Sequence, residues 1–386
     1  MQSTQQVNSH VSLIPAKREQ ISTRIIFFIA GFVTAAWAAI VPYVKLNTGA
    51  NDATLGMLLL CFGGGALIAM PVTGALAAKY GCRRLMVFST IAFCLLFPIL
   101  SSLSQVNFII VALLFFGIFI GLTDCAMNIQ AVIVEKSSDK PIMSGFHGFY
   151  SVGGIAGAGT MSFILLLGVS ATMASMIISI VAVVLLAACY NGLIPYANAP
   201  TGPLIAIPKG IVLVIGIVCF AVFLAEGAVL DWGAVFLIEH HGLKETLGGL
   251  GFAAFATTMT IGRLLGDKIV IRVGSARVVF LGALLACLGF VIAVLSPHLI
   301  FAIIGFALVG AGSSNIVPVM FSAVGKQKTM PEALAVPAIS TLGYLGILAG
   351  PAAIGFVAFQ LSLATALLLI SALLVIIAFV TRFIRV

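Results

Sequence analysis

Charge is scarce in this chain. Charged residues make up 8% of the 386 positions, hydrophobic residues make up 62%, and the mean hydropathy is +1.25. A soluble protein needs a polar shell around its core, so this composition excludes that class and indicates a protein that crosses a membrane many times. Since one helical span takes about 20 apolar residues, a dozen spans with short loops leave little room for a soluble domain.

The sequence also lacks the patterns that carry other functions. Its seven cysteines are scattered, without the paired spacing of zinc sites or disulfide frameworks. The run Glu239, His240 and His241 stands alone, and adjacent histidines point apart on a helix, so no metal is expected. No catalytic constellation and no cofactor motif is recognisable, which argues against an enzyme. The net charge of +8 comes from short loops between apolar runs, which excludes a nucleic-acid-binding surface.

What is present is a series of long apolar segments without strand-like alternation. In lipid every backbone polar group must be paired within its segment, so these runs predict helices. The sequence therefore predicts an all-α membrane protein with twelve transmembrane helices. The predicted spans are 24–45, 53–78, 85–104, 107–134, 144–168, 170–192, 209–238, 246–271, 276–296, 298–324, 332–358 and 361–384.

Basic residues predict the orientation. In the twelve-span arrangement Lys45 and Lys244 fall on one side, and the other basic loop residues fall on the opposite side. Those residues are Lys17, Arg18, Arg24, Lys79, Arg83, Arg84, Lys136, Lys140, Lys209, Lys268, Arg272, Arg277, Lys326, Lys328, Arg382 and Arg385. Because basic loops stay on the cytoplasmic side, both termini are expected in the cytoplasm, in a bacterial inner membrane.

The longest connection divides the spans six and six. It contains four prolines, Pro195, Pro200, Pro203 and Pro208, and is interpreted as a cytoplasmic linker. At an offset near 190 residues, 79–81 (KYG) matches 272–274 (RVG), and Gly121 matches Gly310. These internal sequence matches predict two pseudo-symmetric halves. The predicted organisation is a tail at 1–23, a six-helix bundle at 24–192, the linker at 193–208 and a second bundle at 209–386.

One motif resembles a known family. The segment 74–84, GALAAKYGCRR, follows the second span and is similar to the major facilitator superfamily signature of glycine, three residues, aspartate, a basic residue, any residue, glycine and basic residues. Ala78 stands where the family usually has aspartate. Independently of the family, Gly81 suits a tight turn between two helices, and Lys79, Arg83 and Arg84 suit the anionic cytoplasmic leaflet.

Further segments resemble the fucose-permease-like branch and related bacterial inner-membrane facilitators. They are GLTDCAMN at 121–128, HGFYSVGG at 147–154, AEGAVLDW at 225–232 and GRLLG at 262–266. The resemblance implies a transporter that works by alternating access, with a small-molecule solute, protons and the lipid bilayer as partners and a monomer as the expected state. It also implies that the glycine-rich spans two and eleven, and five and eight, pair across the halves. Ordinary tight packing would explain the same glycines.

Asp124 is the leading candidate for proton coupling. An acidic residue inside a span is costly, so it usually has a function. Asn128 lies four positions on, hence on the same helix face. The alternative is a carboxyl that fixes helix packing through hydrogen bonds.

Glu226 and Asp231 are the other acids well inside the apolar runs. Glu226 is expected in the central cavity, as a substrate ligand or second titrating site. Asp231 points about 140° away from it and suits the site, an outer gate or a hydrogen bond to a neighbouring helix. The remaining candidates for substrate binding are polar or aromatic residues within spans: Trp37, Asn128, Tyr150, Trp232 and Asn315. For the two tryptophans, a lipid-facing or interfacial anchor is the alternative.

Gating residues are expected near the cytoplasmic ends of the spans. Arg263 and Asp267, four apart, suit an ion pair across a turn or with a partner helix, although a site for an anionic substrate is also open. His147, at the start of span five, suits a gate or packing role. Lys79, Arg83 and Arg84 complete this group, with a structural and topological role favoured over substrate contact.

The predicted function is a secondary active transporter of a small polar solute, with a sugar as one candidate, by proton-coupled symport. The alternative is a proton-driven exporter of drugs or metabolites. Residues 148–160 contain no proline, so the glycine and proline signature of such antiporters in span five is missing. A transporter-like sensor is the third class, disfavoured because no soluble domain is present.

Overall fold

The structure is a computed structural model that describes residues 17–138, 140–197, 205, 207–244 and 247–381. These residues form helices α1 to α13 and one short 3-10 turn, and no strand occurs among them. The first half contains α1 (Lys17–Thr48), α2 (Asp52–Tyr80), α3 (Cys82–Ser102), α4 (Val106–Lys136), α5 (Met143–Leu166) and α6 (Ala171–Cys189), followed by η1 (Tyr190–Gly192). The second half contains α7 (Ile211–His241), α8 (Leu250–Val273), α9 (Ser275–Leu295), α10 (Leu299–Ser313), α11 (Ile316–Lys326), α12 (Glu332–Gln360) and α13 (Leu363–Val380).

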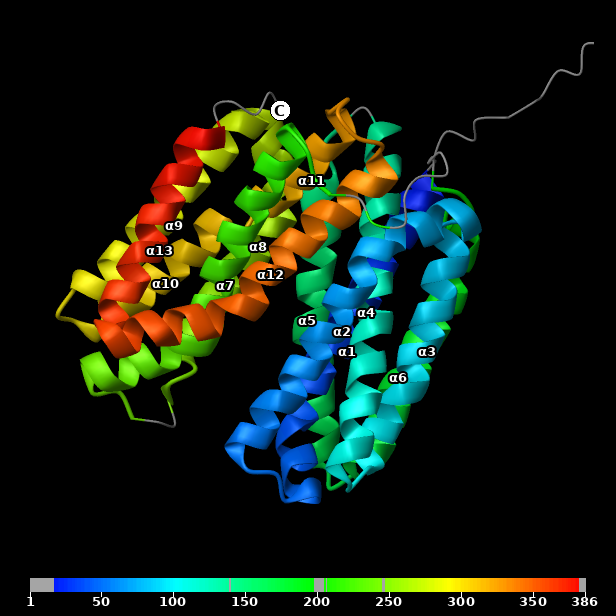
Figure 1. Cartoon of the computed structure of the whole chain (residues 1–386), viewed down its shortest axis with the longest axis horizontal. Helices are drawn as coiled ribbons and strands as arrows, with labels where there is room; N and C mark the ends of the chain where they lie inside the picture. Colours follow the sequence, from blue (N-terminus) through cyan, green and yellow to red (C-terminus); the bar gives the residue numbers. More distant parts are fainter. Residues whose placement is uncertain (1–16, 139, 198–204, 206, 245–246, 382–386) are drawn as a thin grey trace, which may run out of the picture.

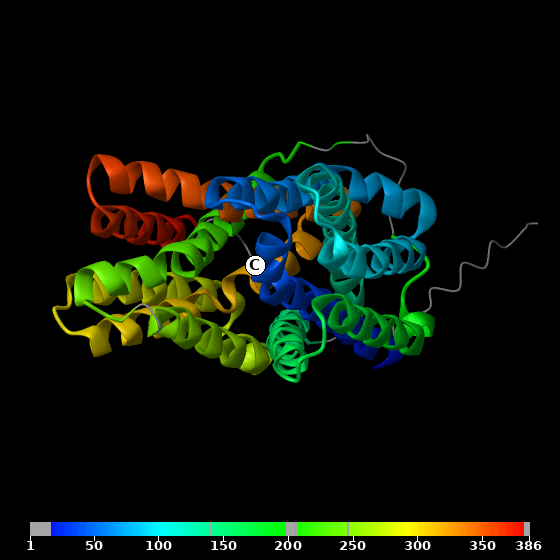
Figure 2. The ribbon, with the colours of Figure 1, turned by 90° about the horizontal axis from the view of Figure 1, so that it is seen from below.

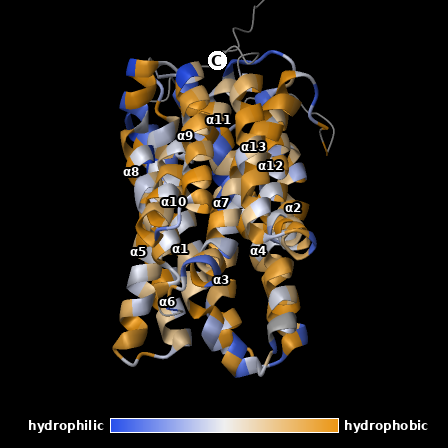
Figure 3. Ribbon diagram, turned by 90° about the vertical axis from the view of Figure 1, so that its left-hand side faces the viewer, coloured by the Kyte–Doolittle hydropathy of each residue, from blue (hydrophilic) through white to orange (hydrophobic). Residues whose placement is uncertain are grey.

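The predicted all-α membrane fold with twelve spans is confirmed, with α10 and α11 together making the tenth span. Eleven stretches of the described chain are long and apolar enough to cross a membrane. The exception among the twelve spans is α8, which carries Arg263, Asp267, Lys268 and Arg272. Hydrophilic residues gather mainly at the two ends of the bundle, with apolar residues between them (Figure 3).

The tenth span differs from the prediction because it is broken at Ser314 and Asn315. Proline has no N–H, so Pro318 cannot donate to the carbonyl four residues earlier, that of Ser314. Helix α11 starts afresh, with the Val319 N–H bonded to the Asn315 carbonyl at 3.1 Å. The break leaves the Ser314 carbonyl available to another helix.

The helices form two groups that lie side by side, α1–α6 and α7–α13 (Figures 1 and 2). We call the end of the bundle that carries the start of α1 and the 193–208 connection the linker end, and the opposite end the far end. The start of α1 at Lys17 precedes the predicted limit at residue 24, and residues 1–16, 198–204, 206 and 382–386 of the predicted tail, linker and second bundle lie outside the described chain. The two groups meet toward the linker end and diverge toward the far end (Figure 1).

Contacts between the halves are made by α2 and α4 with α12, by α5 with α8, and by α4 and α5 with α11. Gly74 lies so close to the Ala333 carbonyl of α12 that a Cβ there would collide with it, and a Cβ at Gly148 would press on the backbone of Arg263. At the far-end positions Gly56 and Gly159 a Cβ would meet nothing within 4 Å. The halves are therefore in contact from the linker end to the centre of the bundle and separate toward the far end (Figure 1).

Most of the glycines in the glycine-rich spans serve packing within a half. Gly153 and Gly157 of α5 face the backbone of α1, and Gly343 and Gly346 of α12 face α7. The pairs α2 with α12 and α5 with α8 do meet, but mainly through glycines nearer the linker end. Ordinary close packing thus explains much of the glycine content.

Candidate functional site

Asp124 lies on α4 at the contact between the halves. It is 9% exposed, and the hydroxyl of Tyr344, on α12 of the other half, lies beside its carboxyl. One turn further along α4, the Asn128 amide donates to the Asp124 backbone carbonyl at 2.9 Å. The Asn128 amide oxygen is buried and has no hydrogen-bond partner among the described residues. The structure therefore places a carboxyl and a free amide oxygen on one helix face, as the spacing predicts.

Two tyrosines connect Asp124 with a second charged group. Tyr150 of α5 lies close enough to Asp124, Glu226 and Arg263 for its hydroxyl to interact electrostatically with all three charged groups. Tyr344 interacts with both Asp124 and Tyr150. The centre of the molecule thus holds a cluster of polar side chains drawn from both halves.

The second charged group is centred on Arg263, which contacts three other residues. It is 7% exposed, and its guanidinium forms an ion pair with Glu226 of α7 at 3.2 Å. It also donates to the Ser151 hydroxyl of α5 at 3.1 Å and to the Ser314 carbonyl at 3.4 Å. The carbonyl freed by Pro318 is therefore used to hold this arginine. Since Ser151 belongs to the other half, Arg263 ties the halves together at their centre.

At the linker end, Asp267 holds the start of α5, one turn along α8 from Arg263. Its carboxylate accepts from the Gly145 backbone N–H, in the first turn of α5, at 2.9 Å. Glu135 of α4 accepts from the N–H groups of Ile142 and Met143 at 2.8 and 2.7 Å. No side chain of the α5 N-cap residue serves this role. Two carboxylates, one from each half, thus satisfy the otherwise unpaired donors of the α5 N-terminus.

The other gating candidates also lie at this end. The His147 ring packs between Phe27 of α1 and Phe321 of α11, at centroid distances of 5.3 and 5.6 Å, and so contacts both halves. Arg83 donates to the Leu193 and Asn191 carbonyls at 2.6 and 3.3 Å, which anchors the start of the 193–208 connection. Lys79 lies over the Tyr80 ring, and Arg84 is exposed. The turn between α2 and α3 is made by Gly81 at φ 81°.

Comparison with known proteins identifies the family. Residues 25–325 match the model of the Major Facilitator Superfamily, which is more than half of the chain. The chain belongs to the major facilitator superfamily. It is accordingly a multi-pass membrane transporter and no enzyme, as the sequence predicts.

Relatives of this facilitator cover nearly its whole length. It is 48% identical over 365 residues to an uncharacterised transporter of the same type from Yersinia pestis, covering 94% of this chain and 95% of that one. It is 31% identical over 358 residues to the membrane protein MosC of Rhizobium meliloti, covering 91% and 86%. In fold it is similar to the fucose:proton symporter FucP of E. coli, with a TM-score of 0.78, 16% identity and coverage of 95% and 98%. The fold likeness thus includes the fucose permease that the motifs resemble.

The structure does not bring all candidates of this facilitator together. Trp37 is buried in the first half, with its ring 6.0 Å from that of Phe116. Trp232 packs against Gly355 of α12. Asp231 is exposed, one turn toward the far end from Gly227. Asn315 lies at the helix break and donates to the Gly262 carbonyl at 3.0 Å. Within the described residues, Trp37, Trp232 and Asp231 make no hydrogen bond or ion pair with the central cluster, whereas Asn315 adjoins it through Ser314, which accepts from both Asn315 and Arg263.

Sequence reasoning missed Tyr344, Ser151 and Ser314. Tyr344 carried a signal, because it is the only tyrosine in the apolar span 332–358. The carbonyl of Ser314 could have been found from Pro318, four residues on. Nothing in the local sequence distinguishes Ser151 from other small polar residues, because its contact with Arg263 exists only when the two halves pack together. Within the described residues, no three His, Cys, Asp or Glu side chains gather in a way that would hold a metal ion.

Removing the Asp267 carboxylate should loosen the linker end. We expect Asp267→Ala to cost about 1 kcal/mol of cap and dipole stabilisation of α5, roughly a fivefold rise in the open population. The measurement is the labelling rate of a cysteine introduced at Ser144, which is 3% exposed at this contact. Glu239→Gln, at the exposed far end, serves as the charge control. An unchanged labelling rate in Asp267→Ala would show that the cap does not hold the halves closed.

Proposed function

We propose that this facilitator carries a small polar solute by alternating access, driven by proton symport. The observation that carries the proposal is Asp124, a titratable carboxyl enclosed between α4 and α12 beside Tyr344. A carboxyl at the contact between two moving halves meets a different environment in each state. Its proton affinity then changes as the halves rock, which is what coupling requires.

The proposed solute site lies between the halves around Asp124, Tyr150, Glu226 and Asn128. Carboxylate, amide and phenol groups can each accept or donate hydrogen bonds, which suits a neutral polyhydroxylated solute. Because Arg263 neutralises Glu226 by a direct ion pair, the cluster presents no surplus positive charge to attract an anion. We therefore favour a sugar or a related polar metabolite, which also agrees with the fold likeness to a fucose:proton symporter.

We further propose that the linker end faces the cytoplasm of a bacterial inner membrane, so that the closed linker end corresponds to an outward-facing state. The basic residues Lys79, Arg83, Arg84, Lys136 and Lys140 all lie at this end. Anionic lipid and the positive-inside rule both favour the cytoplasmic side for such a cluster.

A fusion experiment tests this orientation. A reporter enzyme active only in the periplasm should be silent when fused at Val386 and active when inserted near Gly242. The reverse pattern would invert the topology and with it the direction assigned to the observed state.

Solute uptake tests the function. The full chain is reconstituted in proteoliposomes and supplied with a panel of labelled monosaccharides, polyols and amino acids, with an imposed proton gradient that is acidic on the outside. We expect accumulation of one neutral polar class, which collapses when a protonophore is added. Efflux of drugs driven by the same gradient, without accumulation of any solute, would support the exporter instead.

A further inference from the structure

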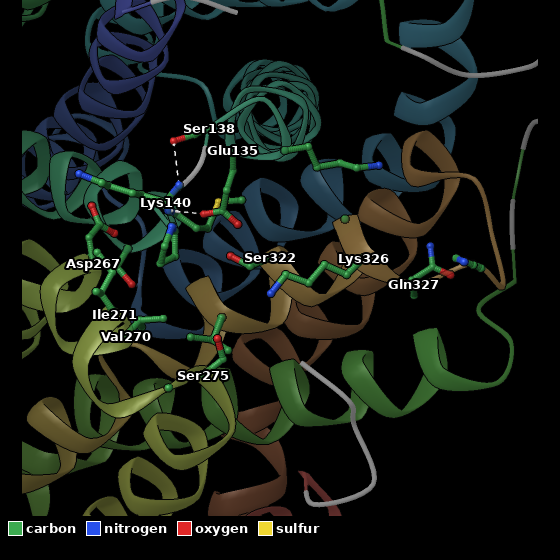
Figure 4. Close-up of a pocket in the computed structure, with 18 residues that line it drawn as sticks. Glu135, Ser138, Lys140, Asp267, Val270, Ile271, Ser275, Ser322, Lys326 and Gln327 are labelled. Atoms are coloured by element: carbon green, nitrogen blue, oxygen red, sulfur yellow. Dashed lines mark hydrogen bonds between the residues drawn. The ribbon is translucent and has the colours of Figure 1, made fainter. Parts of the chain in front are cut away.

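A separate pocket of about 910 Å³ opens between the halves at the linker end. Its walls are the turn between α4 and α5, the last turns of α8, the start of α9, and α11 with the turn that follows it (Figure 4). Neither Asp124, Glu226 nor Arg263 lines it. This pocket is therefore distinct from the central cluster.

The charge of the pocket is predominantly positive. In the first half, Lys136 ends α4 and Lys140 lies in the turn that follows it. In the second half, Lys326 ends α11 and Lys328 lies in the turn that follows it. Figure 4 shows Lys140 and Lys326 extending from different walls, Lys326 beside Ser322. Like charges from the two halves thus face one space, an arrangement that by itself would push the halves apart.

The acidic groups of the pocket are already engaged. Glu135 accepts two backbone hydrogen bonds at the α5 N-terminus, and Asp267 accepts a third. Lys136 forms an ion pair with Glu332 of the other half. In the part of the chain that the structure describes, no ion pair involves Lys140, Lys326 or Lys328. Among the described residues, these three ammonium groups have no carboxylate partner.

We propose that this pocket binds a phosphate-bearing anion that bridges the lysines of the two halves. Phosphate oxygens accept charge-assisted hydrogen bonds from ammonium groups, and the Ser322 hydroxyl on the same wall can donate a further one. The phosphate belongs either to a soluble ion or to the headgroup of an anionic phospholipid. Because the lysines come from both halves, the bound anion favours the state in which the linker end is closed, and its release accompanies opening.

The test is thermal unfolding of the full chain with inorganic phosphate as the probe. Phosphate is raised through the millimolar range in detergent, against chloride at equal ionic strength. A parallel series uses nanodiscs of phosphatidylcholine with and without phosphatidylglycerol. We expect a saturable rise in Tm in at least one series. The variant Lys140→Gln with Lys326→Gln should weaken the apparent affinity about tenfold or more, because each replacement removes a charge-assisted hydrogen bond to the phosphate.

The matched control is Lys17→Gln with Lys209→Gln, which removes the same charge from exposed residues at the same end outside the pocket. A phosphate effect in detergent that is lost only in the pocket variant supports the site and assigns it to a soluble anion. An effect that needs phosphatidylglycerol and is lost only in the pocket variant supports the site and assigns it to a headgroup. The single variant Lys326→Gln should give an intermediate shift. An equal rise in both double variants, or none in wild type, overturns the proposal, and neither outcome bears on transport because no solute is used.

Discussion

We expect Arg263→Ala to lower the stability of this facilitator more than any other single replacement of a basic residue. The change removes the partner of Glu226 and the donor to Ser151 and Ser314. A buried carboxylate left without its partner costs about 3–5 kcal/mol. We expect a marked fall in Tm in detergent and a loss of monodisperse protein.

Two variants show whether the cause is the unpaired charge. Arg272→Ala removes an exposed arginine from the same helix and should leave Tm unchanged. Glu226→Gln combined with Arg263→Met removes both charges together and should recover most of the lost stability, because a buried pair contributes little beyond an apolar replacement. A double variant as unstable as Arg263→Ala would show that shape or the Ser151 contact, and not charge, is decisive.

The number and limits of the helices could be predicted because lipid imposes a length and a polarity on each span. The limits of α2, α4 and α12 agree with prediction to within two residues. The break in the tenth span was not predicted, although Pro318 removes a backbone hydrogen bond there. Mean hydropathy does not change when a helix loses a hydrogen bond.

The partners of the charged residues could not be predicted. Arg263 and Asp267 are four apart on α8, and the sequence left open an ion pair across a turn or one with a partner helix. In the folded protein Arg263 pairs with Glu226 of α7, and Asp267 caps α5. Both partners come from distant parts of the sequence, and only the packing of the halves brings them near. Local spacing therefore does not predict which residues Arg263 and Asp267 bind.

Asp124→Asn should separate exchange of solute from its accumulation. Asparagine keeps the shape of a protonated aspartate but binds no proton. The transporter should therefore still bind solute and alternate between its two states. Its conformational change should no longer be coupled to the proton gradient. Asn128→Asp, which adds a second carboxyl one turn along α4, serves as a comparison for the effect of charge on this face.

The most direct test of proton coupling at Asp124 measures two activities of the same proteoliposomes, with the solute found by the uptake panel. Counterflow reports exchange without a gradient, and uptake under an outside-acid gradient reports accumulation. For Asp124→Asn we predict counterflow close to that of the wild type and complete loss of gradient-driven accumulation. Accumulation that survives intact in Asp124→Asn would contradict the assignment of Asp124 as the proton-coupling residue.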